Sequence, residues 1–290
     1  MGAVITAMVT PFDQEGKVDY QTAVELARYL SKNGSDAVIL SGTTGESPTL
    51  TREEKLELFR QVVKEVGHEI KVIAGTGSNS TAAAIELTSE AAKAGADGIL
   101  LVTPYYNKPT QEGLYKHFKL IASATDLPVI LYNVPGRTGV NMTAATTLRL
   151  AEIDNIVAVK EASGDVEQAA AICRQAPEGF CLYSGDDSMT LPMLSVGASG
   201  VMSVASHLVG REIAGMINHY KEGRRLQAQQ IHHRLLPLFK GLFIVSNPIP
   251  IKAALNLIGI KVGEPRLPLL PLEEKLKLDL QQILKELRLV

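Results

Sequence analysis

The chain has 290 residues, of which 46% are hydrophobic and 21% charged, the proportions of a folded globular protein rather than a disordered one. Its formal net charge of −2 excludes the basic surface of a protein that binds nucleic acid or an anionic membrane. Two cysteines, Cys173 and Cys181, exclude a disulfide framework, and the histidines show no spacing typical of a zinc site.

The first residues lack a basic leader, and no apolar run approaches the roughly 20 residues that span a bilayer. We therefore expect a cytoplasmic protein with no membrane or nucleic-acid partner and no metal.

Short β-branched runs recur along the chain, and a helical pattern follows each of them. Runs this apolar are typical of parallel strands that helices cover. Eight such strands are the number that closes a barrel. The runs cover residues 4–9, 36–40, 71–74, 97–102, 128–132, 156–160, 180–183 and 200–204.

The first clear helix is predicted at residues 51–66, which carry apolar side chains at helical spacing. Thr51 and Glu54 form an S/T-x-x-E capping box at its start. We expect Asn79 to cap the helix after the third strand, and Asp165 or a residue next to it to cap a later one.

The alternative fold is a doubly wound open sheet, which has fewer strands and a glycine-rich first turn that cradles a dinucleotide. Here Thr-Pro-Phe-Asp follows the first strand, and the Gly-Thr-Gly at residues 75–77 lacks a third glycine. We therefore predict the α/β class, with a (β/α)8 TIM barrel over residues 1–209. Residues 210–290 are predicted to be helical throughout, as the eighth barrel helix and a C-terminal helical extension, with a break at 247–250 and a last helix at 272–289.

In such a barrel the active site lies where the strands end. Lys160 ends an apolar strand, and burial there favours the neutral amine that attacks a carbonyl. The alternative is a lysine that reaches solvent or pairs with Glu161. Tyr132 ends the neighbouring strand, where its phenol could move a proton while a carbinolamine loses water, although a lone tyrosine there is more often packing.

Two more strand ends suit carboxylate ligands. The turn Gly42-Thr43-Thr44-Gly45 offers backbone N–H groups and two hydroxyls, and Arg137 offers a fork of donors from a Pro-Gly-Arg-Thr-Gly loop. Each of these features alone is weak. Together, an amine, a phenol, an anion-binding turn and an arginine on one face form a coherent set.

Five segments follow one another along the chain: GTTGE at 42–46, YY at 105–106, YNVPGRTG at 132–139, KEA at 160–162 and SGDD at 184–187. In this order they resemble the dihydrodipicolinate synthase family of the pyruvate-dependent class I aldolase superfamily. The resemblance runs over the full chain and includes the Asn247-Pro248 stretch. It implies a lyase that condenses pyruvate with L-aspartate 4-semialdehyde to 4-hydroxy-tetrahydrodipicolinate, the first committed step of diaminopimelate and lysine biosynthesis.

The resemblance also implies which residues are catalytic. Lys160 is similar to the lysine that forms an imine with pyruvate. Tyr132, Thr44 and Tyr106 resemble the family's proton relay, in which a neighbouring subunit contributes the tyrosine that matches Tyr106. The implied assembly is a homotetramer, a dimer of dimers, with a dimer as the alternative.

Substrate-binding residues are implied in the same way. Thr43 and Thr44 resemble the site for the pyruvate carboxylate, with the backbones of Gly185 and Met202 nearby. Arg137 resembles the residue that holds the carboxylate of aspartate semialdehyde. No metal or organic cofactor is implied, because pyruvate itself is bound covalently.

Other members of the superfamily are the alternatives. N-acetylneuraminate lyases and 2-keto-3-deoxy-sugar-acid aldolases share the lysine and the relay tyrosine, but Arg137 and Thr44 favour the synthase. A non-catalytic barrel homologue is the third possibility, against which all the catalytic positions are filled.

The chain departs from lysine-inhibited members of the family. Those members have histidines at the positions of Arg52 and Lys55 and an acid at Ala83, and Pro48 replaces a small residue. We therefore expect weak or no inhibition by lysine. The positions that match the inhibited pattern are Ser47, Asn79 and Tyr105.

Overall fold

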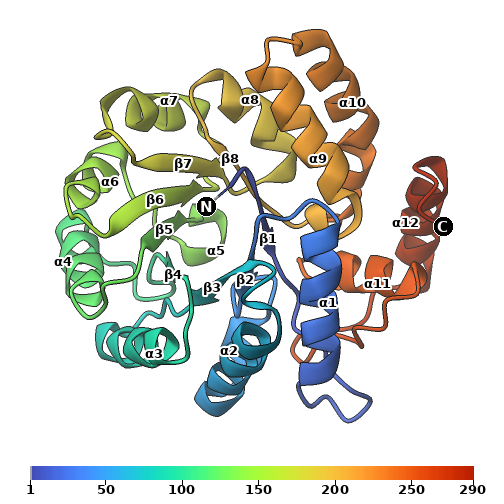
Figure 1. The fold of residues 1–290 in the computed structure, drawn as a ribbon, viewed down its shortest axis with the longest axis horizontal. Helices are drawn as coiled ribbons and strands as arrows, with labels where there is room; N and C mark the ends of the chain where they lie inside the picture. Colours follow the sequence, from blue (N-terminus) through green and yellow to red (C-terminus); the bar gives the residue numbers. More distant parts are fainter. Residues whose placement is uncertain (1) are drawn as a thin grey trace. The chain divides into compact units, whose positions relative to one another are not determined.

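The computed structural model describes residues 2–290. Within this range, strands β1 to β8 follow one another in chain order around a closed parallel barrel (Figure 1). The predicted α/β class and (β/α)8 barrel are thereby confirmed. The strands are β1 (Val4–Ala7), β2 (Ala37–Leu40), β3 (Lys71–Gly75), β4 (Gly98–Val102), β5 (Val129–Asn133), β6 (Ile156–Glu161), β7 (Cys181–Ser184) and β8 (Gly200–Ser203).

Helices alternate with the strands and continue beyond the last one. In the part of the chain that the structure describes, no helix has both the length and the apolar character needed to cross a bilayer. The helices are α1 (Tyr20–Lys32), α2 (Arg52–Val66), α3 (Thr81–Lys93), α4 (Gln111–Ala122), α5 (Pro135–Thr138), α6 (Ala144–Ala151), α7 (Val166–Gln175), α8 (Thr190–Ser195), α9 (Ser206–Lys221), α10 (Arg225–Gly241), α11 (Ile249–Leu257) and α12 (Glu274–Glu286), with short 3-10 turns at Ser47–Thr49 and Asp187–Met189.

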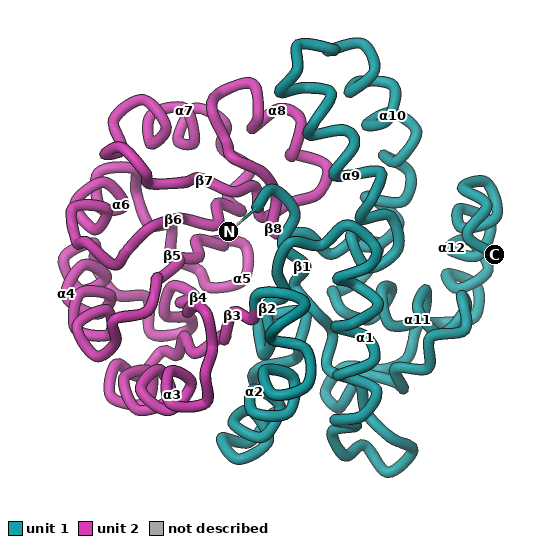
Figure 2. Tube along the Cα trace, in the orientation of Figure 1, with its two compact units in different colours: residues 1–71, 203–290 teal, residues 72–202 magenta. Residues whose placement is uncertain are grey.

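The chain divides into two compact units (Figure 2). One unit combines residues 1–71 with 203–290, so that α1 packs against α2 and α9, and α10 packs against α9 and α12. The other unit is residues 72–202, in which α4 packs against both α3 and α6, and α6 packs against α7. A boundary between barrel and extension at residue 209 stays a prediction.

Two predicted helix starts are confirmed by their hydrogen bonds. Thr51 Oγ1 accepts from Glu54 N at 3.2 Å, and Glu54 Oε2 accepts from Thr51 N at 2.9 Å, which completes the capping box. Asp165 Oδ1 accepts from Gln168 N at 2.9 Å at the start of α7. Both caps satisfy N–H groups that the first turn of a helix leaves without partners.

The predicted cap at Asn79 is wrong by one residue. Ser80 caps α3, and its Oγ accepts from Ala83 N at 3.4 Å. Asn79 instead donates from Nδ2 to the carbonyl of Tyr105 at 3.3 Å. Both side chains suit a cap. The amide of Asn79 is engaged by the carbonyl of Tyr105, a tertiary contact that no local pattern shows, and Ser80 takes the cap position.

The prediction that the extension is helical throughout is wrong. Residues 258–273 form no helix, and the prolines at 265, 268 and 271 in their second half lack the N–H that a helix interior requires. Arg266 fastens this segment to its own unit. Its guanidinium donates to Glu54 Oε1 at 2.6 Å and Oε2 at 2.8 Å, and it lies 4.4 Å from the centre of the Phe12 ring.

Candidate active site

Lys160 lies near the carboxyl end of β6, between two aromatic strand neighbours. It is in register with Tyr132 on β5 and with Tyr183 on β7. Its side chain is 5% exposed, and Nζ lies 4.5 Å from the centre of the Tyr132 ring. The structure therefore brings the predicted amine and the predicted phenol together at the end of their strands.

The surroundings of Lys160 favour its neutral form. Burial lowers its pKa from 10.5 to about 8, an effect that the Asp187 carboxylate partly opposes and the Arg137 guanidinium increases. At a pKa of about 8, about one amine in ten is neutral at pH 7, against about one in three thousand for a free lysine. Lys160 is therefore suited to attack a carbonyl.

Asp187 was not singled out as a site residue from the sequence. It is 2% exposed in the turn after β7 and places a negative charge near the Lys160 amine. Its position within the SGDD segment was the available signal.

The alternative pairing of Lys160 with Glu161 is wrong. Glu161 follows Lys160 in the strand, and successive side chains of a strand point to opposite faces. The fully buried Glu161 carboxylate accepts from Asn133 Nδ2 at 3.1 Å, Ser163 N at 2.7 Å and Gln168 Nε2 at 3.0 Å. These donors account for the carboxylate on the side of β6 away from Lys160.

Arg137 lies on α5, one turn of helix where a Pro-Gly-Arg-Thr-Gly loop was predicted. The turn ends at Gly139, whose φ of 74° is the left-handed conformation that glycine adopts without strain. Asn133, at the end of β5, ties down the following residues, because its Oδ1 accepts from Met142 N at 2.9 Å and its Nδ2 donates to Asn141 Oδ1 at 2.7 Å. The exposed Arg137 is thus held on a fastened segment, close enough for its charge to affect Lys160.

Gly185 lies directly against the β6 strand end. Its N–H donates to the carbonyl of Glu161 at 2.8 Å. A Cβ at this position would lie 2.6 Å from Ala162 Cβ and 3.2 Å from Lys160 Cγ, so only glycine fits without displacing its neighbours. Met202, the other residue named for its backbone, is fully buried in β8.

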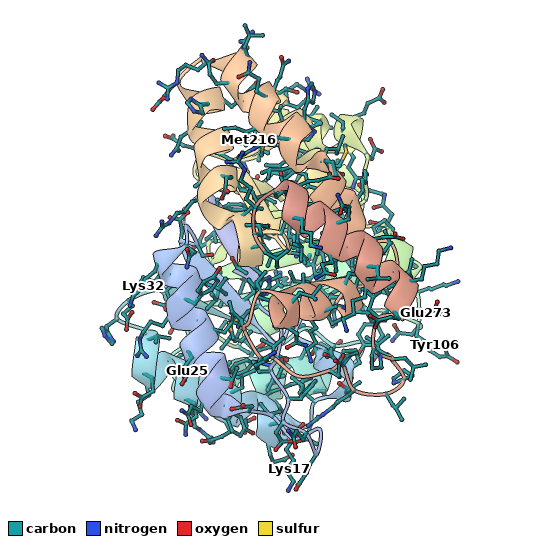
Figure 3. All side chains as sticks on the ribbon, turned by 90° about the vertical axis from the view of Figure 1, so that its right-hand side faces the viewer. Lys17, Glu25, Lys32, Tyr106, Met216 and Glu273 are labelled. Carbon is teal, nitrogen blue, oxygen red and sulfur yellow. The ribbon has the colours of Figure 1, made fainter. Side chains whose placement is uncertain are left out.

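Tyr106 is the predicted relay residue that the structure does not bring to Lys160 within residues 72–202. Its side chain is 90% exposed, and its backbone φ is 73°. In Figure 3 the Tyr106 side chain projects outward from the molecule. The chain thus presents this tyrosine to its surroundings rather than to its own lysine.

Thr43 and Thr44 belong to the other unit, in the turn that follows β2. Thr44 is 2% exposed and Thr43 is half-buried. The Thr44 hydroxyl accepts a hydrogen bond from Asn247 Nδ2 at 2.9 Å. Sequence reasoning did not single out Asn247 as a site residue, although the Asn-Pro stretch that contains it belonged to the matching segments.

The predicted site residues are divided between the two units. Residues 72–202 hold a nucleophilic amine beside a phenol and a nearby arginine, a set that suits Schiff-base chemistry on a carbonyl compound that carries a carboxylate. Across residues 2–290, no group of three or more His, Cys, Asp or Glu side chains is placed to hold a metal ion.

Known proteins resemble this chain over its whole length. A curated relative from Microcystis aeruginosa, named 4-hydroxy-tetrahydrodipicolinate synthase, is 59% identical over 290 residues, which are 100% of this chain and 98% of the relative. A crystal structure of the enzyme from Cyanidioschyzon merolae with lysine bound has a TM-score of 0.98 and 54% identity, covering 100% of this chain and 99% of that one.

A second crystal structure is that of the chloride-inhibited dihydrodipicolinate synthase from Acinetobacter baumannii complexed with pyruvate. It has a TM-score of 0.96 and 42% identity, covering 100% of this chain and 99% of that one. The sequence profile of the dihydrodipicolinate synthetase family matches residues 1–287. With a closed barrel, a buried strand-end lysine and this match, the chain belongs to the dihydrodipicolinate synthetase family.

Proposed function

We propose that the chain is a 4-hydroxy-tetrahydrodipicolinate synthase, a lyase that condenses pyruvate with L-aspartate 4-semialdehyde. The observation that carries this proposal is the buried Lys160 amine, whose pKa is lowered to about 8, beside the Tyr132 ring. The names of the relatives support the synthase over the sugar-acid lyases. The reaction belongs to diaminopimelate and lysine biosynthesis, and we place it in the cytoplasm.

In the proposed reaction the neutral Lys160 amine attacks the pyruvate carbonyl. The resulting carbinolamine loses water to give an imine, and the phenol of Tyr132 moves the proton that the leaving hydroxyl needs. Loss of a methyl proton from the imine gives an enamine, which forms the carbon–carbon bond to the aldehyde. The amine of the semialdehyde then closes the ring and frees Lys160. Covalent pyruvate takes the place of a cofactor.

We assign the other predicted site residues to the carboxylates of the two substrates. We assign the pyruvate carboxylate to the turn with Thr43 and Thr44 and to the backbones of Gly185 and Met202. Arg137 is assigned to the carboxylate of aspartate semialdehyde, because a guanidinium fork matches a carboxylate with two parallel hydrogen bonds.

The proposal is tested by assaying the purified protein with pyruvate and aspartate semialdehyde and, separately, with N-acetylneuraminate. We expect product from pyruvate and aspartate semialdehyde. It is detected by NMR or by coupling the assay to a reductase that consumes the product. Cleavage of N-acetylneuraminate without turnover of aspartate semialdehyde would identify a lyase of the superfamily instead.

We also propose that Tyr106 completes the relay of a neighbouring subunit in a homotetramer built as a dimer of dimers. The Tyr106 side chain is 90% exposed in the single chain, whereas Lys160 is buried, and this difference supports the assignment. A separated chain would then lack a complete relay.

Mixing Tyr106→Phe chains with Lys160→Ala chains, under conditions that allow exchange, should restore activity that neither variant has alone. In a mixed dimer, one site combines an intact Lys160 with an intact Tyr106 from the other chain. Random mixing then gives roughly a quarter of the wild-type number of sites. Steady-state turnover before and after exchange measures the gain.

The matched control mixes Tyr132→Phe chains with Lys160→Ala chains. Tyr132 and Lys160 lie together in one chain, so mixed dimers contain no intact site and activity should not return. Full activity in a verified monomer would contradict the shared relay.

Free lysine should inhibit this enzyme weakly or not at all. The resemblance assigns Arg52, Lys55 and Ala83 to positions that bind lysine in inhibited members of the family. Arg52 and Lys55 share a face of α2, so we expect their charges to repel the ammonium groups of lysine, and Ala83 offers those groups no carboxylate. After screening by solvent, we expect binding to weaken by about 10-fold or more. Activity measured against a lysine series gives the result.

The crystal structure of the Cyanidioschyzon merolae relative contains bound lysine. The weak inhibition that we expect for this chain therefore rests on its own charges at Arg52 and Lys55. The double variant Arg52→His with Lys55→His should increase sensitivity to lysine. Half-inhibition of the unaltered enzyme below about 1 mM would contradict the argument.

A further inference from the structure

The C-terminal extension reaches the side chain of Thr44. Asn247, just before α11, donates from Nδ2 to Thr44 Oγ1 at 2.9 Å, across a separation of 203 residues. Asn247 is 5% exposed and Thr44 is 2% exposed. Such a bond arises only from the folded arrangement, because no local turn joins the two residues.

The chemistry of this bond gives it a direction. A hydroxyl has one hydrogen to donate and two lone pairs, whereas an amide NH₂ group can only donate. Asn247 Nδ2 therefore occupies a lone pair of Thr44 and turns the hydroxyl hydrogen away from itself. Dipoles that are oriented before the substrate arrives need no reorganisation during the reaction.

Separate contacts hold the backbone of the turn that carries Thr44. Glu46, two residues further on, has its Oε1 2.8 Å from Lys252 Nζ, and both side chains are at most 1% exposed. Its Oε2 accepts from the backbone N–H of Arg266 at 2.9 Å. The carbonyl of Gly45 accepts from Thr10 Oγ1 at 2.7 Å. Loss of the Asn247 side chain should therefore release the Thr44 hydroxyl while the backbone of the turn stays in place.

We propose that Asn247 is a positioning residue that sets the direction in which the Thr44 hydroxyl donates, and with it the direction of the proton relay. The inference rests on the proposed function for the role of Thr44. It adds a residue from the extension to a site otherwise built from strand ends.

Two substitutions of Asn247 separate direction from simple loss of a bond. Asn247→Ala leaves the Thr44 hydroxyl free to rotate, and we expect kcat to fall by about 3- to 10-fold. Asn247→Asp is nearly the same size, but its carboxylate only accepts, so the hydroxyl turns the wrong way. We expect kcat to fall by about 100-fold, with a smaller change in the KM for pyruvate.

The pH dependence of Asn247→Asp gives a second measure. A protonated carboxyl can donate to Thr44 Oγ1 as the amide does. The ratio of variant to wild-type kcat should therefore rise as the pH falls from about 8 to about 6, since burial raises the pKa of an introduced carboxyl. A purely structural defect has no reason to recover in this direction.

A double-mutant cycle with Thr44→Val shows whether Asn247 acts through the hydroxyl. In that background the hydroxyl is absent, so both Asn247 substitutions should lower the residual kcat by less than about 2-fold. If Asn247→Asp does not fold, the cycle with Asn247→Ala decides alone.

The control is Asn256→Asp, the same substitution in α11. Asn256 donates from Nδ2 to the carbonyl of Gly263 at 3.0 Å, so thermal stability should fall while kcat stays within about 2-fold.

The inference is overturned if Asn247→Asp is as active as Asn247→Ala, or if the Asn247 substitutions cost as much kcat without the Thr44 hydroxyl as with it. Failure of the proposed function looks different: the wild-type enzyme would then not turn over aspartate semialdehyde at all.

Discussion

Borohydride added with pyruvate should attach one reduced adduct to each chain, at Lys160, and Lys160→Ala should stay unlabelled. The reason is the buried amine, whose pKa of about 8 leaves a substantial neutral fraction beside Tyr132. Without this amine no imine forms, and we expect kcat to fall by about 10⁴-fold or more. Intact mass spectrometry and peptide mapping measure the label.

The rate of labelling should depend on pH in one direction. Only the neutral amine attacks pyruvate, so kcat/KM for pyruvate should fall as the pH drops below the pKa of about 8. Above that value the dependence should flatten, because the amine is then already neutral.

Lys252 provides an internal control for burial alone. It is buried like Lys160, and burial lowers its pKa, but the Glu46 carboxylate 2.8 Å from its amine opposes that shift by stabilising the charged form. The peptide that contains Lys252 should carry no adduct. An adduct on Lys252, or on any lysine in the Lys160→Ala protein, would show that the particular surroundings of Lys160 are not what selects the imine-forming residue.

The strand-end chemistry could be predicted from the sequence because its physical basis is periodic. Apolar runs identify parallel strands, and the carboxyl ends of parallel strands meet on one face without knowledge of their register. Lys160 and Tyr132 needed no more than this to be placed together. The one-turn helix that carries Arg137 is a local detail on a correctly placed segment.

Other features depend on contacts that no local pattern contains. Asn79 and Ser80 are both good caps, and the carbonyl of Tyr105 decides between them. The sequence predicts a helix break at Asn247, and the structure has one there. The hydrogen bond from Asn247 to Thr44 could not be predicted in this way, because it joins segments 203 residues apart. The role proposed for Tyr106 came from resemblance alone, since nothing in the sequence pattern around this residue predicts a contact with another chain.

Arg137→Ala should leave pyruvate labelling intact but lower kcat/KM for aspartate semialdehyde by about 30-fold or more. Loss of one partner from a hydrogen-bonded charge pair costs about 2–5 kcal/mol when the pair is buried, as we expect for Arg137 only with substrate bound. Arg149→Ala is the matched control, because this exposed arginine on α6 pairs with Glu112 at 3.1 Å. It should change kcat/KM by less than about 2-fold.

A second readout separates the charge of Arg137 from its fork. Its positive charge helps to lower the pKa of Lys160, so Arg137→Ala should move the inflection of the pyruvate profile to higher pH. Arg137→Lys keeps the charge but loses the paired donors, so the inflection should stay while kcat/KM for the semialdehyde still falls. If Arg137→Lys recovers full activity, the residue acts as a charge near Lys160 and not as the holder of a carboxylate. If pyruvate labelling is lost in Arg137→Ala, the guanidinium serves the first substrate rather than the second.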